Sequence, residues 1–544
     1  MTATTTRPTL EAIADVSALL RSRAPLIWVV TTEEARAEAG LIEAARDAIY
    51  FPRFWDISSG ITDISGNEDR EFPAPGPYDT NKPDPKDPRG LFDLIRERAV
   101  REPAPGAKAD RNVFILRDVA PWVTPPVGIV QERQLKNLVR LLPRTGRSSA
   151  QSIIVISSDP VPAALRTHAK VVDWPLPDRI EIGEALDGAV TSARRLYQDL
   201  DAAAVREGAI DAALGLTLNE ARSAFAKSLV RHKRIDVAEI VREKRQIILR
   251  EGLLEWVDPL KGGLNSVGGL EVLKGWLRTR ETAWTPEARA YGLPSPKGAL
   301  LVGVPGAGKS LTAKAVATAW QVPLIKVDLG ALKSKFVGES EANLRRAFRT
   351  IEAMGRVVVW FDELEKALAG ASQGAADGGV SSDALGALLG WMQDRRSEAF
   401  VFATANDVSK LPPELLRKGR WDELFWVDLP TRTERCGVLR ATLASYDRAE
   451  IAVDEQAVAV ATNGFTGAEI AALVPEAMFA AFADKARVIT TADLLAAAEN
   501  TVPLSLTAAD KIKALREWGA QNARPASLPE EAAALALDDN QIDL

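Results

Sequence analysis

One segment of the sequence has the residue types and spacing of a phosphate-binding loop. Gly303 to Ser310 reads GVPGAGKS, which fits the pattern G-x-x-x-x-G-K-[ST]. In such a loop the backbone N–H groups close around phosphates, the lysine reaches the β and γ oxygens, and the hydroxyl binds Mg²⁺. A chance glycine-rich turn is the alternative, but a strand-like run precedes the loop and helical periodicity follows it. The pattern therefore predicts that Lys309 contacts the phosphates of ATP or ADP and that Ser310 binds Mg²⁺.

Two carboxylates and an asparagine follow apolar runs that read as buried strands. Asp362 and Glu363 come directly after Val357 to Phe361, and ligands of open α/β sheets lie at the carboxyl ends of strands. A charge pair at a helix N-terminus is the common alternative. With a phosphate loop upstream, we expect Asp362 to hold the Mg²⁺ shell and Glu363 to act as general base on the attacking water. Asn406, after Phe400 to Thr404, either hydrogen-bonds the γ-phosphate or the water, or caps the next turn.

Two arginines stand on a short turn beyond that asparagine. Arg417 and Arg420 belong to the segment LLRKGRWD. A guanidinium offers its N–H donors in one plane, which suits contact with a phosphate. The alternative is an ordinary surface ion pair with Glu414 or Asp422. Because a phosphate loop lies upstream, we assign both arginines to phosphate contact.

Strands alternating with helices must position these side chains. The β-rich runs of the second half are Gly298 to Val302, Leu324 to Asp328, Val357 to Phe361, Phe400 to Thr404 and Leu424 to Val427. Strands that alternate with helices indicate a mostly parallel sheet with both faces covered. Helical patterns return from Arg432 to Val502 and are broken at Asn463 and Gly464.

The first half of the chain follows a similar plan. Leu26 to Val30, Asn112 to Leu116 and Ile153 to Ser157 read as strands, and Gln131 to Leu142 has helical spacing. Prolines crowd between Gly66 and Asp110, so we expect an exposed loop there.

The predicted fold class is α/β, in two successive parts. We expect a first α/β domain at 1–185 with a proline-rich insertion at about 66–110, and a small helical subdomain at 186–255. A second α/β domain follows at 256–431, then a helical segment at 432–505, and a C-terminal helix with an acidic tail at 506–544.

Composition excludes several classes of protein. The 544 residues carry one cysteine, Cys436, and two histidines, so no intramolecular disulfide and no zinc constellation are expected. The net charge of −6 argues against a nucleic-acid-binding surface, which usually shows a basic excess. No stretch is apolar and long enough to span a bilayer, and the first residues lack the apolar core of a signal peptide. We expect a cytoplasmic protein.

The motifs, taken in order, resemble the AAA family within the AAA+ superfamily. Its adenine-side motif is matched by Val267, Gly268, Gly269 and Leu270, and its first pore loop by Phe336, Val337 and Gly338. LLRKGRWD is similar to its second region of homology, and GFTGAE to its lid motif, with Gly467 and Ala468. The resemblance implies a phosphate-loop NTPase module, made of a parallel αβα sheet and a helical lid. It assigns nucleotide contacts to Val267, Gly268, Gly269, Gly303, Pro305, Gly306, Ala307, Gly308, Lys309, Ser310, Leu311, Gly467 and Ala468.

A closer resemblance covers nearly the whole chain. SRAPLIWVVTTEEAR, DWPLPDRIEI, EKRQIILREGLLE and ATANDVSKLPPELLRKGRWDE are similar to the AAA ATPases named for a conserved reading frame of algal plastids and cyanobacteria. In that group the first half resembles a degenerate AAA domain. Here Val30 is followed by Thr31, Thr32, Glu33 and Glu34, with no glycine or lysine for a phosphate. We expect the first domain to be structural or to bind a partner.

The resemblance implies a ring of identical subunits, expected to be a hexamer, in which Arg417 and Arg420 act on the neighbour's γ-phosphate. Hydrolysis would then move Phe336 and Val337 in a central pore that grips a protein client. A buried hydrophobe is the alternative for Phe336, but the polar neighbours Lys335 and Glu339 favour an exposed loop. A nucleotide-gated scaffold is the second reading of the function. A DNA-associated motor is the third, and the missing basic excess counts against it.

Overall fold

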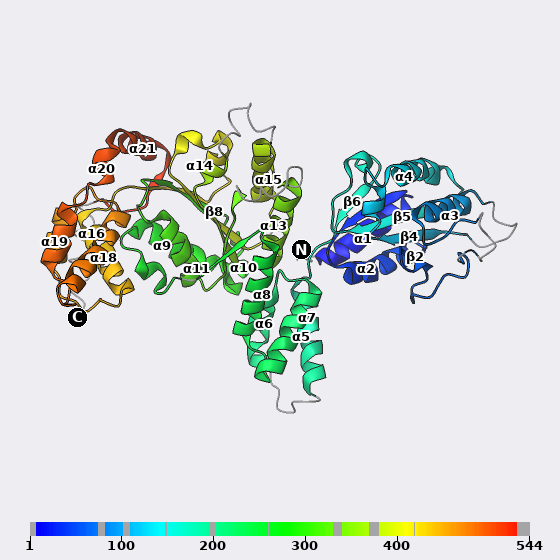
Figure 1. Ribbon diagram of the computed structural model, residues 1–544, viewed down its shortest axis with the longest axis horizontal. Coiled ribbons are helices and arrows are strands. Elements are labelled where there is room, and N and C mark those ends of the chain that lie inside the picture. Colours follow the sequence, from blue (N-terminus) through cyan, green and yellow to red (C-terminus); the bar gives the residue numbers. More distant parts are fainter. Residues whose placement is uncertain are drawn as a thin grey trace. The chain divides into compact units, whose positions relative to one another are not determined.

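The computed structural model describes residues 7–73, 75, 82–101, 109–146, 149–194, 202–258, 260–329, 340–368, 380–395, 397–417 and 419–529. The chain divides into two compact units, Met1–Val237 and Ala238–Leu544 (Figure 1). Within the described residues, no helix is long and apolar enough to cross a membrane.

The first unit is built on a sheet whose strands are parallel except at one edge. It contains β1 (Leu26–Val30), β2 (Phe51–Asp56), β3 (Gly60–Thr62), β4 (Asn112–Arg117), β5 (Gln151–Ser157) and β6 (Lys170–Asp173). The strand order is β3-β2-β4-β5-β1-β6, and only the β2–β3 pair is antiparallel. The predicted strands at β1, β4 and β5 are confirmed, whereas β2, β3 and β6 were not predicted.

Helices cover both faces of this sheet. α1 (Pro8–Arg21) and α2 (Glu34–Asp47) pack on the face that carries Ile27 and Val29, and α3 (Pro88–Val100) and α4 (Ile129–Leu141) pack on the opposite face. Every residue of β1 is buried, because each face of the strand meets a helical layer.

The expectation of an exposed loop throughout residues 66–110 is wrong for the segment that forms α3. Pro88 occupies the first turn of this helix, where proline needs no N–H partner, and the Asp87 side chain accepts a hydrogen bond from the Arg89 backbone. Leu91, Phe92 and Ile95 of α3 are buried in the core. The many prolines before residue 88 indicated a loop, although an amphipathic helix begins at Pro88.

The first unit also contains α5 (Arg179–Arg194), α6 (Arg206–Ala213) and α7 (Leu218–His232). α7 begins with a capping box, in which Thr217 accepts from the Glu220 backbone and Glu220 accepts from the Thr217 backbone. α8 (Val237–Glu251) starts at the division between the units, and its Ile248 belongs to the core of the second unit.

The second unit has its own sheet. It contains β7 (Glu255–Val257), β8 (Gly298–Gly303), β9 (Leu324–Lys326), β10 (Val357–Phe361), β11 (Ala399–Ala405), β12 (Glu423–Val427) and β13 (Arg524–Pro525). The order is β13-β12-β8-β11-β10-β9-β7, with β7 antiparallel to β9 and all other neighbours parallel. The strands predicted for this half are confirmed to within two residues at their ends.

Successive residues of the central strands face opposite helical layers. In β10, Val357, Val359 and Phe361 contact the layer of α13 (Ser340–Met354), α14 (Leu364–Ala367) and α15 (Val380–Asp394). Val358 and Trp360 face α9 (Glu271–Glu281) and α11 (Lys309–Ala319) on the other side. A short helix, α10 (Pro286–Tyr291), follows α9. The sheet is therefore the middle of three layers (Figure 1).

A helical lid follows β12. It consists of α16 (Arg432–Ser445), α17 (Glu455–Ala461), α18 (Gly467–Ala483) and α19 (Thr491–Glu499), which enclose a separate apolar core. Capping boxes at Thr431 and Thr466 start α16 and α18.

The chain then returns to the sheet of the second unit. α20 (Leu504–Thr507) and α21 (Ala509–Asn522) lead into β13, which pairs with β12. The Ala526 N–H donates to the Trp426 carbonyl at 2.9 Å, and the Ala526 carbonyl accepts from the Leu273 N–H at 3.1 Å. The sequence predicted only a helix and a tail here, because a strand of two residues carries no readable periodicity. The acidic end of the chain, 530–544, lies outside the described residues.

Candidate functional site

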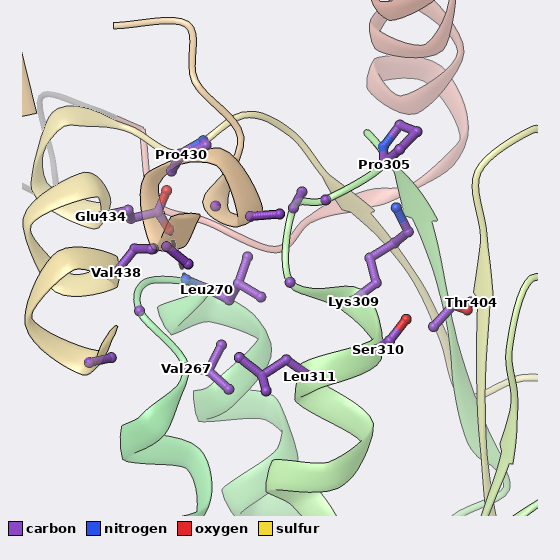
Figure 2. A pocket seen from close by; sticks show the side chains of 18 of the residues that line it. Val267, Leu270, Pro305, Lys309, Ser310, Leu311, Thr404, Pro430, Glu434 and Val438 are labelled. Atoms are coloured by element: carbon purple, nitrogen blue, oxygen red, sulfur yellow. Dashed lines mark hydrogen bonds between the residues drawn. The ribbon is translucent and has the colours of Figure 1, made fainter. Parts of the chain in front are cut away.

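A cavity of about 540 Å³ lies at the carboxyl ends of the parallel strands of the second unit (Figure 2). Its walls are formed by the segment before α9, the loop after β8, the start of α11, the ends of β10 and β11, and the lid helices α16 and α18. The predicted residues among its lining are Val267, Gly268, Pro305, Gly306, Ala307, Gly308, Lys309, Ser310, Leu311, Asp362, Glu363, Asn406, Gly467 and Ala468.

The loop between β8 and α11 has the backbone shape of a phosphate cradle. Gly306 and Gly308 adopt φ angles of +76° and +90°, which side chains with a Cβ rarely take. Gly303 lies behind the loop, where a Cβ would collide with the Val427 carbonyl of the adjacent strand. The N-terminus of α11 follows this loop and lines the cavity. Helix N-termini bind anions.

Lys309 is buried and directs its ammonium to the loop itself. Its Nζ donates to the Gly303 carbonyl at 2.8 Å and to the Val304 carbonyl at 2.7 Å. Burial lowers the pKa of Lys309 to about 8, although the charges of Glu365, Asp362 and Glu363 act to raise it. A phosphate placed in the cradle would supply the countercharge that these neutral carbonyls do not.

Ser310 and Asp362 lie together as the sequence predicted, and Thr404 joins them. The Ser310 hydroxyl donates to Asp362 Oδ1 at 2.9 Å, and the Thr404 hydroxyl donates to the same oxygen at 2.8 Å. Hydroxyl and carboxylate oxygens fit the ligand preference of Mg²⁺, which binds few protein groups and completes its shell with water and phosphate oxygens. The donor set therefore fits the expected ion. Thr404 was not singled out from the sequence, because Ser and Thr are common in strands.

Glu363 and Asn406 are in contact in the lining of the cavity. The Asn406 side-chain amide donates to Glu363 Oε1 at 3.0 Å, and the Glu363 N–H donates to Thr404 Oγ1 at 3.0 Å. Glu363 adopts a left-handed φ of 48°, and unusual backbone conformations of this kind cluster at active sites. The Asn406 side chain therefore contacts the Glu363 carboxylate.

A further carboxylate, Glu365, underlies this pair. Its side chain is 3% exposed, and Oε1 accepts from the Asn406 N–H at 3.0 Å. Burial raises the pKa of Glu365 above its usual range. Glu365 fixes the backbone of Asn406. Sequence reasoning missed it, and the only available signal was its place two residues after Glu363.

Away from the phosphate loop, the lid helix α16 and the segment before α9 line the cavity, mainly with apolar groups. Gly268 packs so closely on α16 that a Cβ would collide with the Val438 backbone. The Leu270 N–H donates to Glu434 Oε1 at 2.8 Å (Figure 2). Gly269, with φ +77°, packs against the same carboxylate. Gly269 thus lies behind the lining, and Glu434 is a residue that the sequence did not point out.

The lid also contacts the phosphate loop directly. The Ala468 N–H at the start of α18 donates to the Gly306 carbonyl at 2.9 Å, and a Cβ on Gly306 would approach the Thr466 hydroxyl at 3.1 Å. The small residues predicted at Gly467 and Ala468 permit this approach.

The arginine pair does not line the cavity of its own chain. Arg417 is exposed, and Arg420 Nη1 donates to the Leu389 carbonyl of α15 at 2.9 Å. The pore-loop residues Phe336, Val337 and Gly338 lie outside the described residues.

Comparison with known families matches four segments of the chain. Residues 299–429 match the ATPase family associated with various cellular activities (AAA), and 452–496 match the AAA+ lid domain. Residues 12–174 and 180–251 match the N-terminal and second domains of SpoVK-like AAA ATPases.

Individual proteins show the same relationship over greater length. The AAA domain-containing protein ycf46 of Pyropia yezoensis is 34% identical over 525 residues, covering 94% of this chain and 99% of that protein. The ycf46 protein of Guillardia theta is 32% identical over 518 residues, covering 93% and 94%. The ATP-dependent zinc metalloprotease FtsH 2 of Bdellovibrio bacteriovorus is 37% identical over 218 residues, covering 39% of this chain and 35% of that protein. The chain belongs to the AAA ATPases, in the family of the ycf46 AAA domain-containing proteins.

Proposed function

We propose that the cavity of the second unit binds Mg-ATP and hydrolyses it, and that this reaction drives the remodelling of a protein client by a ring of identical chains. The convergence of Lys309, Ser310, Asp362, Glu363 and Asn406 on one cavity carries the proposal. These residues come from separate segments, and phosphoryl transfer to water requires the functions that they offer together.

Each residue has a distinct part in the proposed reaction. Lys309 neutralises the β and γ phosphates, and the N–H groups of the loop hold their oxygens. Ser310 and Asp362 would hold Mg²⁺, which when bound offsets the charge of the phosphate oxygens. Asn406 and Glu363 orient the attacking water, and Glu363 accepts its proton.

The arginine pair is assigned to the neighbouring subunit's γ-phosphate. Arg417 is exposed and both arginines lie away from the cavity lining of their own chain, which supports action across an interface. An arginine supplied in this way makes hydrolysis depend on assembly. A hexameric ring is the arrangement proposed.

A nucleotide-gated scaffold is the second candidate, because the first unit has a complete α/β core without a phosphate loop and offers a surface for partners. The change Phe336→Ala separates the two functions. Client-stimulated hydrolysis that disappears in this variant supports a motor, whereas slow hydrolysis that is unaffected supports a scaffold.

Replacement of the proposed base is the first test of the site. Glu363→Gln keeps the size of the side chain, but its amide does not accept the proton of water. ATP should still bind, and turnover should fall by roughly 10²-fold or more. The measurement is phosphate release alongside nucleotide affinity, with Glu469→Gln as a control, because Glu469 acts in the capping box of a lid helix and does not line the cavity. Near-normal turnover in Glu363→Gln would reject Glu363 as the base.

A further inference from the structure

Both oxygens of the Glu363 carboxylate are held by side chains. Oε1 accepts from Asn406 at 3.0 Å, and Oε2 accepts from the Lys366 ammonium at 2.6 Å. Lys366 belongs to α14, the single helical turn that starts immediately after Glu363. No oxygen of the proposed base is therefore free of a donor.

The two donors differ in how firmly they are placed. Asn406 is anchored through its backbone N–H by the buried Glu365 carboxylate. The Lys366 side chain is 69% exposed and reaches Glu363 only through its flexible four-carbon stem. Of the two contacts, the one with Lys366 is the more easily broken.

Proximity along the chain lets the Lys366 contact form without a nucleotide. Glu363 and Lys366 are three residues apart, and a backbone hydrogen bond from the Lys366 N–H to the Glu363 carbonyl at 2.9 Å closes the turn between them. The pair therefore needs no movement of the lid or of another chain to form. The carboxylate raises the pKa of Lys366, so the ammonium stays charged at neutral pH.

We propose that Lys366 is a positioning residue that restrains the proposed base Glu363 through this ion pair and so keeps the basal rate of ATP hydrolysis low. The proposal rests on the proposed function of the site. A negatively charged group that competes for Lys366 would release the restraint.

The bonds that break and form during ATP hydrolysis show how the Lys366–Glu363 ion pair affects the reaction. An O–H bond of water breaks and its proton passes to a Glu363 oxygen, while the water oxygen bonds to the γ-phosphorus. The bond from the γ-phosphorus to the bridging oxygen breaks, and ADP leaves with that electron pair. An oxygen whose lone pairs face an ammonium is a poorer acceptor, so the Lys366 contact must loosen before Oε2 takes the proton.

The test is steady-state hydrolysis by the full-length chain carrying Lys366→Gln, which keeps most of the stem and removes the charge. The kcat should rise by roughly 1.5- to 5-fold, the modest factor expected for an exposed ion pair, and KM for ATP should not change. Lys366→Arg keeps the ion pair and should behave like the unaltered protein. A residue that merely stabilised the fold would not raise kcat when removed.

A matched control lies in the same unit. Lys410 forms an ion pair with Asp407 at 3.2 Å, also at i,i+3 and with a 62% exposed lysine side chain, but it does not line the cavity. Lys410→Gln should leave kcat unchanged. An unchanged or reduced kcat in Lys366→Gln overturns the proposal. The double variant with Glu363→Gln should be inactive, and activity there would instead reject Glu363 as the base and with it the proposed function.

Discussion

The two units of the chain share a sheet plan and differ at the point where a nucleotide would bind. The strand order β6-β1-β5-β4-β2 of the first unit corresponds to β12-β8-β11-β10-β9 of the second, and in each an antiparallel strand pairs with the last member. The same framework therefore carries a phosphate loop in one unit and lacks it in the other. The fold alone does not confer nucleotide binding, which depends on a few residues after the first central strand.

The connection after that strand is shorter in the first unit. Thr31 to Glu33 join β1 to α2, where the second unit has Val304 to Gly308 between β8 and α11. The Glu33 carboxylate of this turn accepts from the Leu218 N–H at 2.5 Å, at the start of α7. In the second unit, the corresponding approach of lid to loop is made by backbone groups, from the Ala468 N–H to the Gly306 carbonyl.

The signs of the charges at the strand ends are also reversed. In the second unit a lysine begins α11 and two carboxylates directly follow β10, whereas in the first unit Arg117 ends β4 and forms ion pairs with Glu38 of α2 and with Asp56. Asp118 nevertheless keeps the left-handed φ of 48° that Glu363 has. The first unit thus keeps this one backbone feature after β4, while ion-paired side chains stand near the ends of β1 and β4.

The largest expected effect is on hydrolysis by the second unit, which alone carries the arginine pair Arg417 and Arg420. Arg417→Ala and Arg420→Ala should each leave ATP binding largely intact and reduce turnover by roughly 10³-fold, the scale of losing an arginine finger. The measurement compares nucleotide affinity with turnover in each variant.

Mixing then shows whether these arginines act across an interface. Arg417→Ala chains keep Lys309 and Glu363, and Glu363→Gln chains keep both arginines, so mixed rings contain some complete sites. Turnover should recover on mixing although neither parent is active. Mixtures that stay inactive despite demonstrated subunit exchange would show that the arginines act within their own chain.

The stability of the first unit should depend on the polar side chains around Arg36, near the end of β1. Arg36 lies in a largely buried network, with Nε donating to Glu33 at 2.8 Å and Nη1 to the Thr9 hydroxyl at 3.0 Å, and its guanidinium also contacts Glu181. Arg36→Ala removes the positive charge that faces the buried Glu33 and the largely buried Glu181 and should lower the stability of this unit by about 3 kcal/mol.

Hydrogen exchange at the amides of β1 measures this loss. Arg21→Ala is the control, because the Arg21–Asp47 pair of the same unit has both side chains 58% exposed and should matter little. Equal protection in the two variants would mean that the network does not hold the first unit together.

A smaller effect should appear in the pH dependence of ATP binding. Binding favours the charged form of Lys309, whose pKa burial lowers to about 8. Affinity should therefore hold below pH 8 and decline above it, by at most about tenfold per pH unit. Lys309→Arg should lose this alkaline decline, because a guanidinium stays charged. An alkaline decline that persists in Lys309→Arg would assign the titration to another group.

Some of this architecture could be predicted from the sequence, and the reasons for the failures are physical. Buried central strands such as Val357–Phe361 can be predicted because their sequences are uninterrupted apolar runs. The helix α3 was hidden by the prolines before it, and β13 was hidden because its pairing with β12 depends on tertiary contact.

Within the site, too, local sequence patterns can be read and contacts between distant residues cannot. Residues of the phosphate loop follow one another in the chain, so their pattern is readable. Glu365 and Glu434 act through hydrogen bonds to Asn406 and Leu270, which lie 41 and 164 residues away in the sequence. No local pattern marks a partner at such a distance, and only the fold brings these groups together.

The second unit of each chain should bind nucleotide, and the first unit should not. Calorimetric titration of the Glu363→Gln protein with Mg-ATP measures the number of sites without interference from hydrolysis. We expect one nucleotide per chain, and none when Lys309→Ala is added, because the buried ammonium is the main countercharge to the phosphates. Two nucleotides per chain, or one that survives the loss of Lys309, would contradict this expectation.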